Sequence, residues 1–145
     1  MNPLEEVGDG PASGAVASSE DAKMTVLVVD DELEITEILC EALAGAGHKA
    51  IAARDGREGL EAYEREKPHV VVSDIMMPTL DGPALVRAIR SRDDGAHTVI
   101  ILMSAARSLA DDPTLEHDLF LEKPFDLDHF IEQVGTFASG RIAQR

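Results

Sequence analysis

Five short apolar segments, separated by longer stretches of mixed character, organise the hydrophobic positions of this chain. They are Val26–Val29, Lys49–Ala53, Val70–Val72, Val99–Leu102 and Leu119–Leu121. Short, β-branched runs of this kind are typical of strands in a parallel sheet covered on both faces. Lys49–Ala53 is rich in alanine and the weakest of the five, so we expect it nearer an edge of the sheet.

Between these segments, apolar residues recur at helical spacing and the ends carry capping residues. Gly45 and Gly47 end the first predicted helix. Asp55 and Glu58 form a capping box for the second helix, which ends before Pro68. Asp81 and Pro83 begin the third helix, and Asp126 begins the last. A fourth helix from about Ala105 must be short or broken, because Pro113 disfavours helical geometry at Asp112. The sequence thus predicts an α/β fold: a doubly wound, five-stranded parallel sheet with five helices, the fourth short or broken.

The first 23 residues differ in composition from the rest. Gly, Ala, Ser, Pro and acidic residues dominate them, and such a segment buries too little apolar surface to offset its ordering entropy. The sequence therefore predicts a disordered acidic leader over residues 1–23, one folded domain over 24–140 and a C-terminal tail over 141–145.

Charge and cysteine content limit the classes of function. The chain has 28 acidic and 13 basic residues, a net charge of -15, which argues against binding nucleic acid. Cys40 is the only cysteine, so no internal disulfide can form and a reducing compartment is the simplest inference. No apolar run is long enough to span a bilayer. We expect a cytoplasmic protein without membrane insertion.

The notable polar residues each follow a predicted strand. They are Asp30, Asp31, Asp74, Ser104 and Lys123. The carboxyl ends of parallel strands meet at one edge, so we expect these side chains to converge. Three carboxylates repel one another and favour a hard divalent cation, here Mg²⁺. Carboxylates, Mg²⁺, a hydroxyl and an ammonium are the parts of a phosphoryl-transfer site, with Asp74 as the candidate nucleophile.

Four phrases make a resemblance specific. The segments are Val28–Glu32, Ser73–Pro78 with Asp81-Gly82, Ser104-Ala105 and Lys123–Phe125. Together they resemble the receiver domain of two-component response regulators, and the resemblance covers residues 24–140. The resemblance implies a flavodoxin-like sheet of order 2-1-3-4-5. Because no output domain follows Arg145, a single-domain regulator is expected.

By this resemblance, Asp74 takes a phosphoryl group from a phosphohistidine on a histidine kinase or histidine phosphotransfer protein. Asp31, Asp74 and the backbone carbonyl of Met76 would bind Mg²⁺, and Asp30 would assist through water. The protein would then switch contacts with a downstream protein target. It would act as a monomer or weak dimer, and it would not be an enzyme but would only assist its own phosphorylation and dephosphorylation.

The resemblance also implies roles at the next two strand ends. Lys123 would contact the phosphoryl group, and its bond to Pro124 would be cis. Ser104 would move to a phosphoryl oxygen, with Phe120 turning inward as the switch aromatic. Departures from the family lie between Ser104 and Lys123, where typical receivers have a few more residues.

Three other functions share features with this pattern. A receiver-like adaptor could act without phosphorylation, although the acidic pair, Asp74 and Lys123 argue against it. A Mg²⁺-dependent aspartyl phosphatase of the haloacid dehalogenase type needs a second aspartate two residues after the nucleophile, where this chain has Met76. A flavodoxin-like FMN protein would have to stack its flavin without Trp and with one Tyr.

Overall fold

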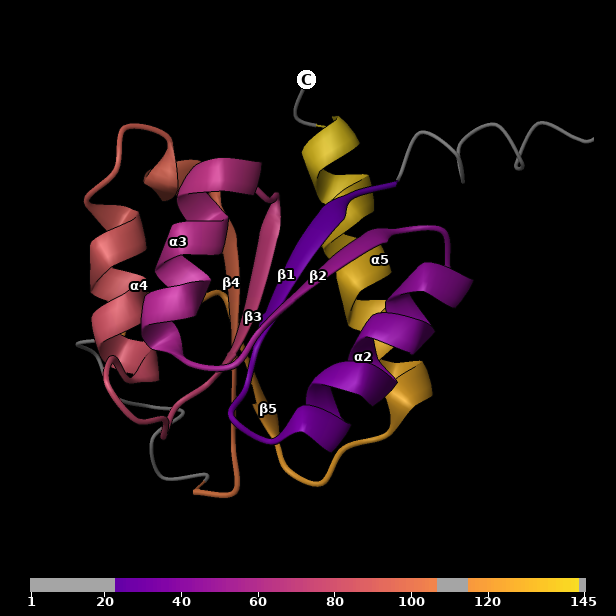
Figure 1. Cartoon of the computed structure of the whole chain (residues 1–145). Coiled ribbons are helices and arrows are strands. Elements are labelled where there is room, and N and C mark those ends of the chain that lie inside the picture. The colour runs from indigo at the N-terminus through magenta and orange to yellow at the C-terminus, as the bar shows by residue number, and fades with distance from the viewer. Residues whose placement is uncertain (1–22, 107–114, 144–145) are drawn as a thin grey trace, which may run out of the picture.

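A five-stranded parallel sheet forms the centre of the molecule (Figure 1). The computed structural model describes residues 23–106 and 115–143. The strands are β1 (Thr25–Val29), β2 (Lys49–Ala53), β3 (Val70–Asp74), β4 (Val99–Ser104) and β5 (Leu119–Glu122). Their order is β2-β1-β3-β4-β5, and every neighbouring pair is parallel. The predicted order is confirmed, and the alanine-rich β2 lies at an edge as expected.

Helices cover both faces of the sheet (Figure 1). They are α2 (Leu33–Gly45), α3 (Gly56–Glu66), α4 (Gly82–Arg90) and α5 (Leu127–Ala143), with a short 3₁₀ helix, η1, at Gly95–His97 that the sequence pattern did not predict. None of the helices in the described ranges is long and apolar enough to cross a membrane. Helical backbone in α5 continues beyond residue 140, where the sequence placed the end of the domain.

The strands divide their side chains between two cores, because successive residues of a strand point to opposite faces. Val26 and Val28 of β1 pack with α2 and α5, whereas Leu27 and Val29 pack with α3 and α4. All five side chains of β3 are buried. The central strand is therefore held from both sides, which fixes the position of Asp74 at its carboxyl end.

Two of the predicted caps form as expected, with one difference in detail. Asp55 accepts a hydrogen bond from the Glu58 amide at 2.8 Å, and Asp81 accepts one from the Ala84 amide at 3.0 Å. The Glu58 carboxylate accepts from the backbone amide of Arg54 at 2.7 Å, one residue before the position that a capping box uses. The guanidinium of Arg54 also pairs with the Glu58 carboxylate, at 3.4 Å. This ion pair helps to keep the carboxylate beside the Arg54 amide.

The predicted fourth helix falls largely on residues 107–114, which lie outside the described ranges. Ala105 and Ala106 on one side, and residues 115–118 on the other, are not helical. The described flanks thus give no continuous helix from Ala105 to His117, and the short or broken helix stays a prediction.

The turn from β3 into α4 brings backbone close to backbone. The Gly82 amide donates to the Ile75 carbonyl at 2.8 Å. A Cβ atom at Gly82 would lie 2.6 Å from the Asp74 carbonyl oxygen, closer than real Cβ contacts allow. Glycine is therefore required at this position for α4 to start directly beside the end of β3.

Candidate functional site

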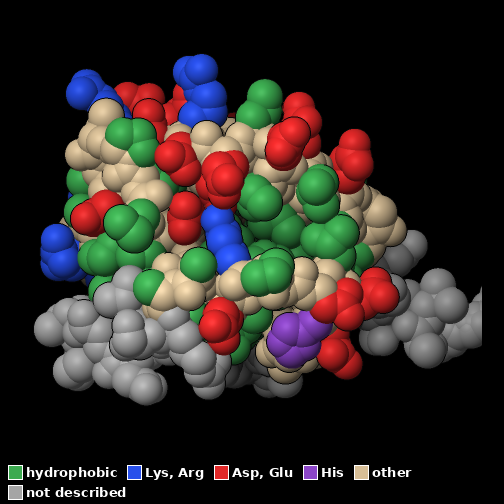
Figure 2. Space-filling model, turned by 90° about the horizontal axis from the view of Figure 1, so that it is seen from below, with side chains coloured by type: hydrophobic (Ala, Val, Ile, Leu, Met, Phe, Trp, Pro, Cys, Tyr) green, Lys and Arg blue, Asp and Glu red, His purple; other side chains and the backbone are tan. Residues whose placement is uncertain are grey.

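The carboxyl edge of the sheet gathers the polar residues that the sequence singled out. Asp30 follows β1, Asp74 ends β3, Ser104 ends β4 and Lys123 follows β5. Figure 2 views the molecule from this edge and shows acidic side chains clustered on it beside a patch of hydrophobic ones. The structure confirms that the predicted aspartates and Lys123 converge at this edge, and these groups interact most directly.

Asp30, Asp31 and Asp74 form an acidic cluster with the spacing of a metal site. One carboxylate oxygen from each lies within 4.8 Å of the other two, and they are the one such group in the described ranges. Asp30 is fully buried, Asp74 is 9% exposed and Asp31 is exposed. Three carboxylate oxygens this close together can hold one Mg²⁺ ion, either directly or through bound water.

Hard carboxylate oxygens at this spacing fit Mg²⁺ and offer no soft sulfur or imidazole ligand. The predicted carbonyl ligand belongs to Met76, two residues after Asp74 in the turn between β3 and α4. Its side chain is 71% exposed and takes no part in the core. The metal-binding role of this carbonyl stays a prediction.

Lys123 provides the positive charge of the site. Its Nζ atom lies 2.8 Å from Asp30 Oδ2, 3.6 Å from Asp74 Oδ2 and 3.6 Å from Glu32 Oε1. The other oxygen of Asp30 accepts a hydrogen bond from the Glu32 amide at 2.9 Å. Both oxygens of this buried carboxylate are therefore paired. The peptide bond between Lys123 and Pro124 is cis, as predicted.

Burial and charge shift the pKa values of the two central groups. Burial raises the pKa of Asp74; the charges of Asp30 and Asp31 add to this rise, while Lys123 opposes it. Burial alone would lower the pKa of Lys123, but its bond to Asp30 and the nearby carboxylates raise it overall. Lys123 therefore remains an ammonium at neutral pH and provides positive charge beside the carboxylates.

Ser104 and Phe120 lie at the strand positions that the sequence predicted. Their contacts in this structure are with neighbouring backbone and core side chains. Ser104 is 4% exposed, and its Oγ accepts a hydrogen bond from the Ala106 amide at 3.0 Å. Phe120 packs against the core under α3 and α4, and its ring meets His117 edge-on with centroids 6.3 Å apart. Their switching roles stay predictions.

Two features of the site were missed by sequence reasoning. The first is Glu32, the third acidic residue after β1, whose place beside Lys123 depends on a partner far along the chain. The second is an apolar groove of about 470 Å³ next to Lys123, lined mainly by side chains of α2 and of the segment entering α5. Ile38 in this groove is 47% exposed and Leu127 is 37% exposed. The sign of this groove in the sequence was that apolar residues cover a wider face of the first helix than packing against the core requires.

Comparisons with known proteins agree with this arrangement. A family model described as the response regulator receiver domain matches residues 26–135. The probable transcriptional regulator ycf27 of Cyanophora paradoxa is 39% identical over 106 residues, which are 71% of this chain and 43% of that protein. The chain spans less than half the length of the curated relatives it matches.

Solved structures show the same fold. The receiver domain of the Francisella response regulator 1452 is 30% identical with a TM-score of 0.72, covering 82% of this chain and 98% of that chain. The receiver domain of the sensor histidine kinase PA1611 from Pseudomonas aeruginosa matches with a TM-score of 0.73 over 80% of this chain and 98% of that chain. That structure has a magnesium ion coordinated in its active-site cleft, and at 22% identity the likeness shows the fold alone.

Proposed function

Because this chain belongs to the family of response regulator receiver domains, we propose that it takes a phosphoryl group from a partner's phosphohistidine onto Asp74. The observation that supports this most directly is the contact of one lysine with two carboxylates from different strands, at the end of the central strand. The Asp74 side chain is 12% exposed, so an incoming phosphoryl group can reach it. The chain would serve a two-component or phosphorelay pathway.

In the proposed step, an oxygen of the Asp74 carboxylate forms a bond to phosphorus. The bond from phosphorus to the donor's imidazole nitrogen breaks, and the imidazole leaves with the electron pair. A Mg²⁺ ion held by Asp31 and Asp74, with Asp30 acting through water, would neutralise charge on the phosphoryl oxygens. Lys123 Nζ has both Asp30 and Asp74 within 3.6 Å, so it can contact a phosphoryl oxygen without leaving Asp30.

The phosphodonor is proposed to be a histidine kinase or a histidine phosphotransfer protein. The apolar groove beside Lys123 supports a protein donor, because exposed aliphatic side chains next to a charged site favour a macromolecular partner. The downstream target is proposed to be another protein, reached as a monomer or weak dimer.

Three further parts of the proposal follow from the sequence. The chain is proposed to act on no substrate beyond its own phosphoryl group. It is proposed not to bind nucleic acid, because its net charge is -15, although the ycf27 relatives are named probable transcriptional regulators. A cytoplasmic location is proposed from the single cysteine, Cys40.

Labelling with a small phosphodonor tests the proposal. Incubation with acetyl phosphate and Mg²⁺ should add one phosphate per chain, detected by intact mass, and Asp74→Asn should abolish it. Asp93→Asn, which removes an exposed carboxylate between α4 and η1, is the matched control and should label normally. Undiminished labelling of the Asp74→Asn protein would refute the assignment.

A further inference from the structure

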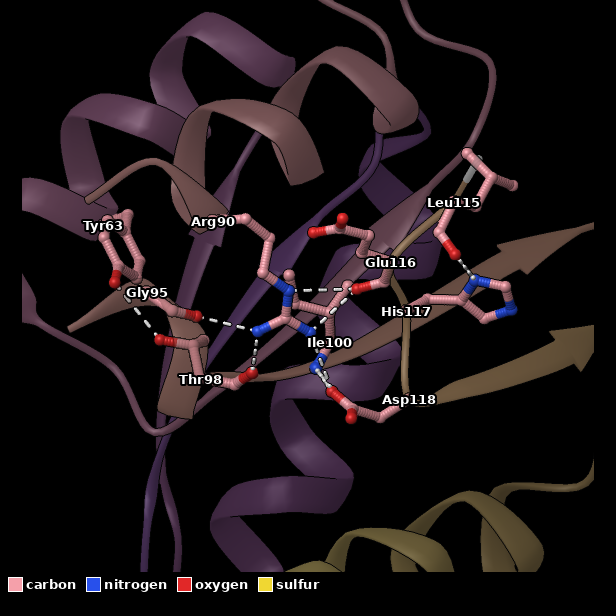
Figure 3. A network of polar contacts seen from close by, with 9 residues as sticks. All are labelled: Tyr63, Arg90, Gly95, Thr98, Ile100, Leu115, Glu116, His117 and Asp118. Atoms are coloured by element: carbon pink, nitrogen blue, oxygen red, sulfur yellow. Dashed lines mark hydrogen bonds and ion pairs between the residues drawn. The ribbon is translucent and has the colours of Figure 1, made fainter. Parts of the chain in front are cut away.

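Arg90, the last residue of α4, connects two loops (Figure 3). These loops precede β4 and β5, so they lie at the edge of the sheet opposite the site. Its Nη1 donates to the carbonyl oxygens of Gly95 and Thr98, each at 2.7 Å. Nε and Nη2 donate to the Glu116 carbonyl at 3.0 and 2.8 Å, and Nη2 also donates to Asp118 Oδ2 at 3.1 Å. All five guanidinium N–H groups are therefore used. We call Arg90 with these four partners the Arg90 clasp.

Asp118 extends the clasp into the sheet. Its amide donates to the Ile100 carbonyl at 2.7 Å, and its Oδ2 accepts from the Ile100 amide at 2.8 Å (Figure 3). The pairing of β4 with β5 begins one residue later, at Ile101 and Leu119. Asp118 and Arg90 together thus define the register in which β5 starts.

β5 is a short strand, so hydrogen bonds at its start add to what its pairing with β4 and its packing provide. It has four residues and, within the described ranges, pairs with β4 alone. Of its side chains, only Leu121 is buried. Yet β5 contains Phe120 and leads directly to Lys123, whose amide donates to the Ser104 carbonyl at 2.9 Å. The strand is therefore fixed by hydrogen bonds at its two ends.

We propose that Arg90 is a positioning residue for the phosphoryl-transfer site. The clasp fixes where β5 begins and thereby where Phe120 and Lys123 lie. Lysine cannot replace arginine here, because an ammonium has three donors and no planar fork to reach the carbonyls of both loops at once. The link to Lys123 rests on the proposed function, whereas the anchoring of β5 does not.

The first test is amide hydrogen exchange on Arg90→Lys, with Arg87→Lys as the control. Arg87 lies on the same helix one turn earlier and is exposed. In Arg90→Lys, exchange in the peptide covering residues 115–123 should be about tenfold faster, while peptides from β1 and β3 stay unchanged. Arg87→Lys should match the wild type throughout.

A second test separates positioning from a general loss of structure. Asp30, Asp31 and Asp74 are positioned by β1 and β3 rather than by β5, so Arg90→Lys should retain Mg²⁺ affinity within about twofold by calorimetry. Its labelling rate with acetyl phosphate should fall about tenfold, because Lys123 is no longer held in place. A merely structural role would lower Mg²⁺ affinity and labelling together.

Asp118→Asn covers the case in which Arg90→Lys does not fold. It retains an oxygen for the Ile100 amide but loses the charge that pairs with Arg90, so faster exchange should again be confined to residues 115–123. Unchanged exchange of that peptide in both variants, or equally faster exchange in all strands, would overturn the proposal. Failure of Asp74 to label would refute the proposed function and leave the exchange result standing.

Discussion

Lys123 lies among three carboxylates that differ in distance or in exposure, and these differences decide what each can do. Asp30 is the closest, at 2.8 Å, and fully buried, so it holds the ammonium most strongly. Asp74 is farther away, at 3.6 Å, so Lys123 holds it less tightly and leaves it accessible for the proposed phosphoryl transfer. Glu32, also at 3.6 Å, has a side chain 65% exposed and contributes little, because water screens it.

We expect two side chains to set the lifetime of the proposed phosphorylated state. By the family resemblance, Met76 and Ala106 occupy the positions that influence the water attacking the phosphorus. Both are exposed, and the Ala106 amide donates to Ser104 Oγ at this edge of the sheet. Neither side chain can orient a water. We therefore expect slow intrinsic dephosphorylation, accelerated on the order of tenfold in Met76→Asn with Ala106→Glu.

Decay of the purified phosphoprotein in Mg²⁺, followed by intact mass, measures this lifetime. Ala105→Glu adds the same carboxylate one residue away and serves as the control. Wild-type decay as fast as that of the double variant would contradict the expectation.

At the scale of elements, the start of β1 is held by two imidazoles from the loops before its neighbouring strands. The Met24 amide donates to His48 Nδ1 at 3.1 Å, and the Thr25 amide donates to His69 Nδ1 at 3.0 Å. Each imidazole accepts only while this nitrogen carries no proton. The strand that leads to Asp30 is therefore anchored by neutral histidines.

This anchoring predicts acid sensitivity. Burial lowers the pKa of His48 below its ordinary 6.5, so the folded state favours the neutral ring. The stability that His48 contributes is complete above pH 6.5 and is lost as pH falls from there towards the lower folded pKa, because the unfolded chain binds the proton first. His48→Asn places an oxygen near the Nδ1 position and cannot titrate. Its free energy of unfolding should fall less on acidification than that of the wild type.

Urea denaturation followed by circular dichroism, at about pH 7.5 and about pH 5.5, checks this difference. His129→Asn on α5, where the ring is 49% exposed, is the control and should behave as the wild type. Equal acid sensitivity in His48→Asn and the wild type would show that the imidazole is not the cause.

For the whole molecule, the net charge of -15 acts against the compact state and in favour of cation binding. If Mg²⁺ binds the folded protein at the three aspartates, a concentration ten times the Kd should stabilise the fold by about 1.4 kcal/mol, which is several degrees in Tm. Asp74→Asn removes a ligand and should gain less. A receiver-like adaptor without a metal site would show no Mg²⁺-specific rise in Tm.

NaCl at matched ionic strength is the control for screening, because added salt weakens charge repulsion without a specific site. Thermal unfolding of wild type and Asp74→Asn in both salts makes the comparison. Equal gains from Mg²⁺ and NaCl in the wild-type protein would exclude a specific ion at this edge.

The sequence by itself determined the five strands and the four helices α2, α3, α4 and α5. Runs such as Val70–Val72 and caps such as Asp55 and Asp81 are local signals, read over a few residues, and the structure follows them closely. The converging strand ends could also be predicted, because a parallel sheet brings them to one edge whatever the side chains are. Asp74 at the end of β3 is a consequence of that rule.

Tertiary structure alone decided which side chains meet. Lys123 contacts Asp30 across 93 positions of the chain, and Arg90 reaches Glu116 across 26. Periodicity and capping act over one or two turns, so they hold no information about partners this distant. The short β5 shows the consequence: its apolar residues predicted a strand, but the polar clasp that sets its register exists only once α4 and β4 are packed beside it.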